Sequence, residues 1–324
     1  MHDSIKNFPE QFEYSPVIEN SKKLKRFSKF VLVGMGGSHL AGDLLKIWNP
    51  KLEVLIHSNY GLPENLKKNK KDILIILSSY SGNTEEVLDA FRLASRNKLE
   101  MAIIASGGKL LEAARKYKKP YIQLPNTGIQ PRMATGFGFR ALLKLMGENR
   151  GLSESALLAK SLKSFEAGRY GKALARKLKG QVPIIYSSYK NFSIAKNWKI
   201  KFNETAKIPA FCNFFPELNH NEMTGFDLKD STRPLSQRFY FLFLKDPDDS
   251  KQMIKRMNIT ERLYRERGLP TEVVILNGKS SLAKIFSSLL LADWTAYYLA
   301  EEYGVDSEQV PMVEEFKRLI KSLL

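Results

Sequence analysis

A cluster of hydroxyl side chains, Ser78–Thr84 with the sequence SSYSGNT, lies between an apolar run and a helical pattern. The run Ile73–Leu77 is typical of a strand buried on both faces, and residues 85–94 have helical spacing. Hydroxyls and backbone N–H groups would converge at the helix N-terminus, where the helix dipole favours an anion. No lysine lies inside the turn, so it is not a Walker loop. We predict a hydroxyl-lined phosphate site; the alternative is an ordinary turn in which Asn83 and Glu86 form a capping-box-like pair.

A second turn, Gly34–Ser38, follows the apolar run Phe30–Val33 and precedes a helical apolar face that begins at Ala41. Its glycines would let the backbone turn tightly and approach a ligand. The pattern is GxGGS and lacks the full GxGxxG spacing, so a dinucleotide fingerprint is incomplete.

An arginine, Arg132, lies in the Gly/Pro-rich loop Pro125–Thr135. Its planar fork of donors could clamp an oxyanion. The alternative is an arginine on the protein surface, which is the commoner situation.

A glutamate, Glu204, ends an amphipathic helical stretch within Lys201–Lys207, KFNETAK. A carboxylate there could act as a general base. The alternative is a helical salt bridge with Lys201 or Lys207.

A histidine, His220, lies between two asparagines in the turn-rich segment Phe215–Phe226. Imidazole is the side chain best suited to moving a proton near neutral pH. The alternative is a loop histidine hydrogen-bonded to nearby backbone.

The order of these elements predicts an α/β fold with doubly wound parallel sheets flanked by helices. Strands ending in Gly or Ser turns alternate with helical patterns, and a ligand should bind beyond the strands' carboxyl ends. The expected strands are Phe30–Val33, Glu53–His57, Ile73–Leu77, Met101–Ala105, Tyr121–Leu124, Val182–Tyr186, Arg238–Leu244 and Thr271–Leu276.

The polar stretch Gly147–Glu154 marks a domain boundary, so we expect domains at 1–150 and 151–324. A helical stretch over Ser155–Lys179 is expected to open the second domain.

Composition narrows the class of protein. The chain has 324 residues, is 43% hydrophobic, and has neither 18 consecutive apolar residues nor an apolar signal core, so we expect a cytoplasmic protein with no membrane partner. Cys212 is the only cysteine and the four histidines lie far apart, so we expect neither a disulfide nor a metal site. The net charge of +17 could indicate nucleic-acid binding, but the lysines are scattered, which favours a solvated basic surface.

The motifs GMGGS, SYSGNT, PRMA, FNETAK and PELNHNE, in this order and spacing, resemble the bifunctional phosphoglucose/phosphomannose isomerases of the sugar isomerase (SIS) domain superfamily. The resemblance runs from about Phe30 to the C-terminus and implies two tandem SIS-type sheets. It implies that the phosphate and sugar are bound by Ser79, Ser81, Thr84, Gly36, Gly37 and Ser38. It further implies that Glu204 is the base between C1 and C2 and that Arg132 stabilises the enediolate. His220 would open the sugar ring in a partner subunit of a homodimer, and Lys317 would enter the site from the last helix.

The resemblance therefore implies interconversion of glucose 6-phosphate and fructose 6-phosphate, and also of mannose 6-phosphate and fructose 6-phosphate. Proton transfer through a cis-enediolate needs no cofactor. The segment Asp306–Gln309 departs from the Asp-Pro-Thr-Pro of many members, which bears on the mannose activity. Two alternatives stay open: a non-catalytic sugar-phosphate-binding SIS regulator and a nucleic-acid-binding protein.

Overall fold

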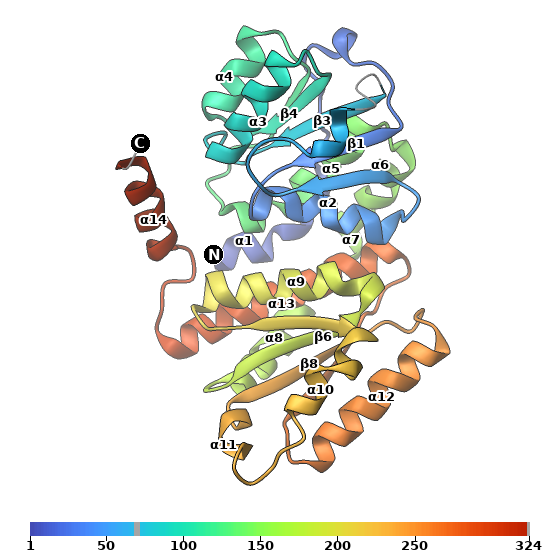
Figure 1. Cartoon of the computed structure of the whole chain (residues 1–324), viewed down its shortest axis with the longest axis vertical. Helices are drawn as coiled ribbons and strands as arrows, with labels where there is room; N and C mark the ends of the chain where they lie inside the picture. The colour runs from blue at the N-terminus through green and yellow to red at the C-terminus, as the bar shows by residue number, and fades with distance from the viewer. Residues whose placement is uncertain (68–71, 323–324) are drawn as a thin grey trace. The chain divides into compact units, whose positions relative to one another are not determined.

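The apolar runs of the sequence form two separate parallel sheets in the computed structural model, which describes residues 1–67 and 72–322 (Figure 1). The chain divides into two units. The N-terminal unit comprises residues 6–162 and 278–286, and the C-terminal unit comprises residues 1–5, 163–277 and 287–324. The predicted fold class, α/β with two helix-flanked parallel sheets, is confirmed.

The sheet of the N-terminal unit has five parallel strands in the order β2-β1-β3-β4-β5. The strands are β1 (Lys29–Val33), β2 (Glu53–His57), β3 (Ile73–Ser78), β4 (Met101–Ala105) and β5 (Tyr121–Gln123). The three central strands are buried almost throughout, as both faces of a parallel sheet should be. The order reverses between β1 and β3, so the ligand site expected for this topology lies beyond the carboxyl ends of these two strands.

Helices cover this sheet and close its core. They are α2 (Gly37–Trp48), α3 (Glu85–Arg96), α4 (Gly108–Lys116), α5 (Thr135–Met146), α6 (Asn149–Ala156) and α7 (Leu158–Ser161). Shorter 3₁₀ turns are η1 (Phe8–Glu13), η2 (Ser21–Lys23), η3 (Glu64–Lys67) and η4 (Pro131–Met133). The chain's first helix is α1 (His2–Lys6). The rings of Phe12 and Phe139 lie 4.7 and 5.2 Å from that of Phe286, which fixes η1 and residues 278–286 in this core.

The sheet of the C-terminal unit has four parallel strands in the order β7-β6-β8-β9. They are β6 (Val182–Ser188), β7 (Phe211–Phe215), β8 (Phe239–Lys245) and β9 (Thr271–Ile275). The surrounding elements are α8 (Ser164–Leu178), η5 (Tyr189–Asn191), α9 (Phe192–Lys201), the π-helical turn η6 (Phe202–Ala206), η7 (Glu217–His220), α10 (Glu222–Gly225), α11 (Arg233–Ser236), α12 (Lys251–Glu266), α13 (Ser281–Tyr303) and α14 (Pro311–Ser322).

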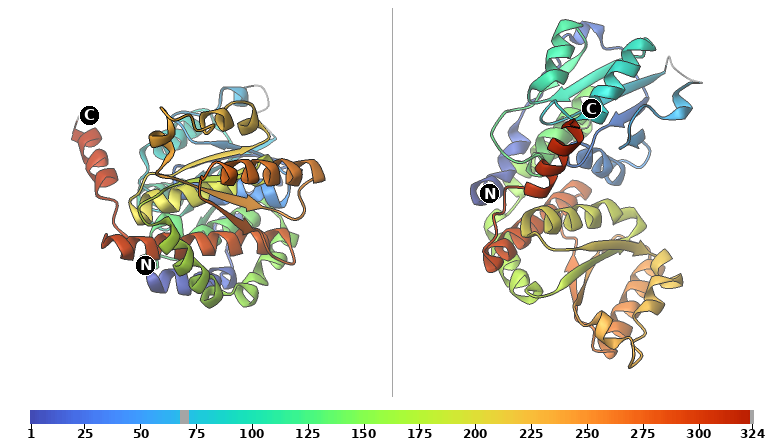
Figure 2. Two further views of the ribbon diagram at one scale, coloured as in Figure 1. Left: turned by 90° about the horizontal axis from the view of Figure 1, so that it is seen from below. Right: turned by 60° about the vertical axis from the view of Figure 1, so that its left-hand side comes forward.

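Alternation along the strands divides this sheet into two faces. One face carries Tyr186, Phe241 and Phe243 in an aromatic core with Tyr264 of α12. The other face carries Phe214, whose ring lies 4.9 Å from that of Phe192 at the start of α9. The sheet therefore lies between α9 and α12 (Figures 1 and 2).

Two expectations about elements were wrong or incomplete. The stretch Ser155–Lys179 is not one helix, because the backbone is extended at Leu162, ψ 127°, where α7 ends and before α8 begins. The run Phe211–Phe215 is a strand, β7, which is absent from the strands expected from the sequence. Within the described residues, no helix is long and apolar enough to cross a membrane.

The turn after β3 depends on a glycine, and substitution tests that dependence. Gly82 has φ +69°, and a Cβ there would lie 1.8 Å from the carbonyl oxygen of Gly107. Gly61 has a similar φ of +76° with nothing within 4 Å of its Cβ position, so it is the matched control. Gly61→Ala should lower the free energy of unfolding by about 1–2 kcal/mol, because alanine is strained in the left-handed backbone conformation. Gly82→Ala must also displace backbone and should cost more than about 3 kcal/mol, measured by urea unfolding. Equal losses for the two variants would contradict this packing.

Candidate active site

The turn after β3 is braced from inside by a buried serine. Ser79 is fully buried; its hydroxyl accepts a hydrogen bond from the N–H of Gly82 at 3.1 Å and lies 2.8 Å from the Thr84 hydroxyl. Ser81 is exposed and Thr84 is half-buried. Of the three predicted phosphate ligands, Ser79 thus shapes the turn, whereas Ser81 and Thr84 are open to solvent in part or in full.

The start of α3 lacks a side-chain cap. The N-cap residue is Thr84, and its side chain makes no capping hydrogen bond. Asn83 instead donates to the carbonyl oxygen of Ser81 at 3.2 Å and accepts from the N–H of Lys109 at 3.1 Å. The capping-box alternative is therefore wrong, because the Asn83 side chain bonds within its own turn and to the turn before α4. A twelve-residue helix thus directs its positive dipole end at the hydroxyls of this turn.

The turns after β1 and β3 are joined by hydrogen bonds. The Ser38 hydroxyl accepts from the N–H of Tyr80 at 2.9 Å, and the Ser78 hydroxyl donates to the carbonyl oxygen of Ser38 at 2.9 Å. We call Gly36–Ser38 together with Ser79–Thr84 the cradle. It lies where the strand order reverses, as the topology requires.

Arg132 belongs to the same unit as the cradle and is buried. Its side chain is only 2% exposed, so the surface-arginine alternative is wrong. Its turn, η4, touches the cradle: a Cβ on Gly37 would lie 2.7 Å from the carbonyl carbon of Pro131 and 2.9 Å from the Arg132 nitrogen. Only a glycine lets these two backbones approach so closely. A buried guanidinium keeps its charge and is suited to holding an oxyanion.

Glu204 lies in the π-helical turn that ends α9. Such turns are frequent at functional sites. Phe202 and Thr205 on either side are buried, and Glu204 itself is half-buried. Lys201, one of the two lysines expected to pair with Glu204, places its ammonium 2.5 Å from a carboxylate oxygen of Asp293, and both side chains are buried. Lys207 donates to the main-chain carbonyl of Glu204 at 2.6 Å.

His220 ends η7 and is exposed, while its neighbours are held. Leu218 is fully buried, and the Asn219 amide donates to the hydroxyl of Thr260 on α12 at 2.8 Å. Asn221 caps α10 by accepting from the N–H of Glu222. Across the described part of the chain, no hydrogen bond reaches the His220 ring, which contradicts the alternative of a backbone-bonded loop histidine.

Lys317, the last of the predicted residues, lies on α14. Its ammonium pairs with Glu314 at 2.7 Å, and both side chains are more than half exposed. Such a pair contributes little to stability.

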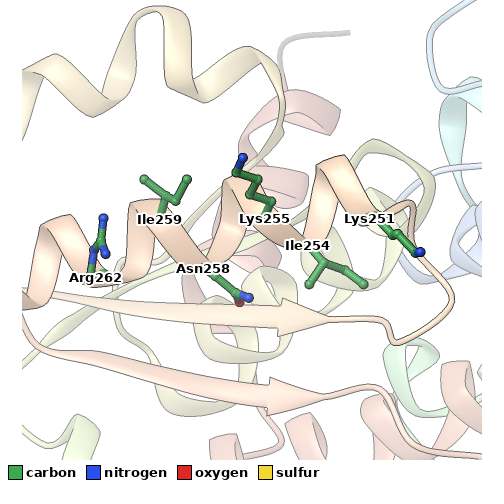
Figure 3. A pocket seen from close by; sticks show the side chains of 6 residues that line it. All are labelled: Lys251, Ile254, Lys255, Asn258, Ile259 and Arg262. Carbon is green, nitrogen blue, oxygen red and sulfur yellow. The ribbon is translucent and has the colours of Figure 1, made fainter.

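The structure thus brings together the cradle and Arg132 in the N-terminal unit, and places Glu204, His220 and Lys317 in the C-terminal unit. A hollow of about 500 Å³ on α12 contains none of them. It is lined by Lys251, Ile254, Lys255, Asn258, Ile259 and Arg262 (Figure 3). All six belong to one helix, so the hollow is a groove on a helix surface with no converging elements. In the described residues, no group of three side chains could hold a metal ion.

Sequence reasoning did not single out two residues of these turns. The main-chain carbonyl of Tyr80 links the cradle to the turn after β4 by accepting a hydrogen bond from the Ser106 N–H at 2.9 Å, and the Tyr80 phenol donates to the carbonyl oxygen of Pro125 at 3.4 Å. Glu222, two residues after His220, accepts hydrogen bonds from the Tyr186 phenol at 2.5 Å and from the Asn213 amide. An acidic neighbour of a loop histidine is too common for the sequence to mark it.

Comparison with known proteins gives a consistent result. Residues 168–320 match the family model described as bacterial phospho-glucose isomerase C-terminal SIS domain. A bifunctional phosphoglucose/phosphomannose isomerase of Aquifex aeolicus is 32% identical over 98% of this chain and 97% of its own length. One of Caldicellulosiruptor bescii is 33% identical over 100% and 99%. The C-terminal domain of glucosamine-fructose-6-phosphate aminotransferase from Francisella tularensis has the same fold, with a TM-score of 0.68 at 13% identity over 95% of this chain and 96% of its own.

Each of the two isomerases aligns with this chain over nearly the full length of both proteins at more than 30% identity. Such an alignment indicates that the entire chains share a common ancestor. With its two parallel sheets and its matching C-terminal SIS domain, the chain belongs to the bifunctional phosphoglucose/phosphomannose isomerase family.

Proposed function

We propose that this protein is an aldose–ketose isomerase that interconverts glucose 6-phosphate and fructose 6-phosphate, and also mannose 6-phosphate and fructose 6-phosphate. The observation that carries the proposal is the cradle: hydroxyls and an uncapped helix N-terminus meet where the strand order of the N-terminal sheet reverses. That arrangement suits a phosphate monoester. Both relatives described above are named for these two activities.

Binding comes first in the mechanism. Ser81, Thr84 and the first N–H groups of α3 hold the phosphate, and Gly36, Gly37 and Ser38 line the sugar's path. The phosphate is remote from the reacting carbons, so its binding energy fixes which carbons meet the base.

Chemistry follows at C1 and C2. Glu204 takes the proton from C2 of the open-chain aldose and returns it to C1, while a proton passes from O2 to O1. Arg132 stabilises the negative charge on the enediolate oxygens, and Lys317 adds a second cation from α14. The enediolate is planar at C2, so both C2 epimers can share it, which accounts for glucose and mannose substrates in one site.

Ring opening requires a separate proton shuttle, the role of His220. Glu204 follows α9 on one face of the C-terminal sheet, whereas His220 lies in the segment packed on the opposite face with α12. Glu204 also precedes the five-residue strand β7 and His220 follows it, a strand length of about 16 Å, whereas O5 and C1 of one sugar are bonded to each other. This separation supports a homodimer in which each site takes Glu204 from one subunit and His220 from the other.

The cradle is tested by removing its open hydroxyls. Ser81→Ala and Thr84→Ala should each raise KM for fructose 6-phosphate about 10-fold, because each loses one hydrogen bond to a charged group. Steady-state kinetics measures this. Ser95→Ala, at an exposed position near the end of the same helix α3, is the control and should leave KM unchanged. An unchanged KM in both cradle variants would place the phosphate elsewhere.

The base is tested by Glu204→Gln. We expect kcat to fall about 10³-fold with both aldose substrates, because the amide cannot accept the C2 proton. A coupled assay for fructose 6-phosphate measures it, with the exposed Glu166→Gln on α8 as control. Full activity in Glu204→Gln would refute the assignment. A wild-type protein that binds sugar phosphates without turnover would instead be the regulatory SIS protein.

The shared site is tested by complementation. Glu204→Gln and His220→Ala chains, co-expressed with different tags, should regain about a quarter of wild-type activity, because half of the random dimers carry one intact site of two. Each variant alone should be nearly inactive. Absence of recovery in isolated mixed dimers would mean that both residues act within one chain.

A further inference from the structure

The segment that carries His220 is anchored on both sides of an exposed imidazole. On its N-terminal side, Leu218 is fully buried in the aromatic core, and Asn219 bonds to the buried Thr260 of α12. On its C-terminal side, Glu222 is held against the sheet. His220 lies between these two attachments.

The attachment at Glu222 uses both carboxylate oxygens. The Tyr186 phenol donates to Oε1 at 2.5 Å, and the Asn213 amide donates to Oε2. Tyr186 and Asn213 are register partners on β6 and β7, so their side chains point to the same face of the sheet. Two rigid neighbouring strands therefore fix one carboxylate in position and direction.

The donors are well suited to this task. Burial raises the pKa of Tyr186, as does the neighbouring Tyr264, so the phenol stays protonated and donates. Tyr186 is fully buried among the rings of Phe215, Phe241 and Phe243 and cannot follow a moving loop. Hydrogen bonds from neutral donors to a carboxylate are stronger than those between neutral groups.

We propose that Glu222 is a positioning residue for ring opening: it clamps the segment Glu217–Glu222 to β6 and β7 and so fixes where the His220 imidazole projects. This inference rests on the proposed function, which gives His220 its proton-transfer role. Glu222 itself touches neither substrate nor the reacting atoms in this assignment. Its loss should affect only the step that His220 performs.

The experiment compares a cyclic substrate with one that cannot close a ring. Glucose 6-phosphate is mostly pyranose and must be opened. An aldohexose 6-phosphate lacking the hydroxyls at C4 and C5 forms neither a five- nor a six-membered ring, yet it keeps the phosphate-to-C1 chain length. Turnover is measured on the first, and wash-in of solvent deuterium at C2 by NMR is measured on the second.

Glu222→Ala should lower kcat for glucose 6-phosphate about 10- to 100-fold, the effect expected of a displaced catalytic group. Exchange on the acyclic analogue should stay within about twofold of wild type, which also shows in the same sample that the protein is folded. Glu222→Gln should also be slow, because an amide keeps one acceptor oxygen, so its N–H₂ faces either the Asn213 amide or the Tyr186 phenol and one of the two hydrogen bonds is lost or reversed. The double variant Glu222→Gln with Asn213→Asp exchanges donor and acceptor and should recover most of the turnover. Glu217→Gln, an exposed carboxylate in the same segment, is the matched control and should behave as wild type.

His220→Ala separates the inference from the function on which it rests. If His220→Ala turns over glucose 6-phosphate normally, the proposed role of His220 fails and the inference fails with it. If His220→Ala is slow only on the cyclic substrate while Glu222→Ala is normal, the clamp alone is refuted. Equal loss on both substrates in the Glu222 variants, or no recovery in the double variant, would also refute it.

Discussion

The close approach of main chains at the carboxyl edge of the N-terminal sheet is the constraint on which the candidate site depends. Gly82 meets Gly107, and Gly37 meets Pro131, at distances that leave no room for a Cβ. The first contact joins the turn after β3 to the turn before α4, the second joins the turn after β1 to the Arg132 turn, and the hydrogen bonds of Ser38 join the two pairs. The hydroxyls and helix end of the cradle converge only because this backbone packing permits it. The main-chain contacts therefore determine where the side chains of the candidate site lie.

The C-terminal unit holds apart Glu204 and His220, the two residues to which we assign proton transfer in the proposed function. Its sheet carries the π-turn of Glu204 after the helix on one face and the His220 segment on the other. The buried pair Lys201–Asp293 fixes the start of the π-turn, and the aromatic core fixes the His220 segment. Breaking a buried ion pair by removing one partner is strongly destabilising, so the Glu204 turn has little freedom. Rigid supports on opposite faces agree with the proposal that Glu204 and His220 of one chain serve two different sites.

The sequence was sufficient to predict the elements that are determined by the pattern of neighbouring residues. Buried strands such as Ile73–Ser78 read as apolar runs because both faces of a parallel sheet are covered. The strand β7 was missed because FCNFF places a polar Asn213 inside an aromatic run, with no period to reveal a strand. The burial of Arg132 and the partner of Lys201 depend on segments distant in the chain, Gly37 and Asp293, which no local pattern encodes. Asparagine is a common helix N-cap, but the side chain of Asn83 accepts a hydrogen bond from the N–H of Lys109 and does not cap α3. The roles of the site residues themselves stay predictions.

The two sheets also show why one phosphate site per chain is a reasonable expectation. The order of the C-terminal sheet reverses between β6 and β8, the place equivalent to the cradle. There the chain puts Asp246, which is 3% exposed and accepts hydrogen bonds from Lys190 at 2.9 Å and Asn191 at 3.2 Å. Ser188 lies at the end of its strand, as the serines near the cradle do, and its hydroxyl donates to Asp249 at 3.0 Å. A buried carboxylate at this point repels a phosphate dianion and already uses the local donors. The two sheets thus differ at this edge, because glycines and hydroxyls follow β1 and β3, whereas aspartates follow β8; this difference supports the proposal of a single phosphate site, in the N-terminal sheet.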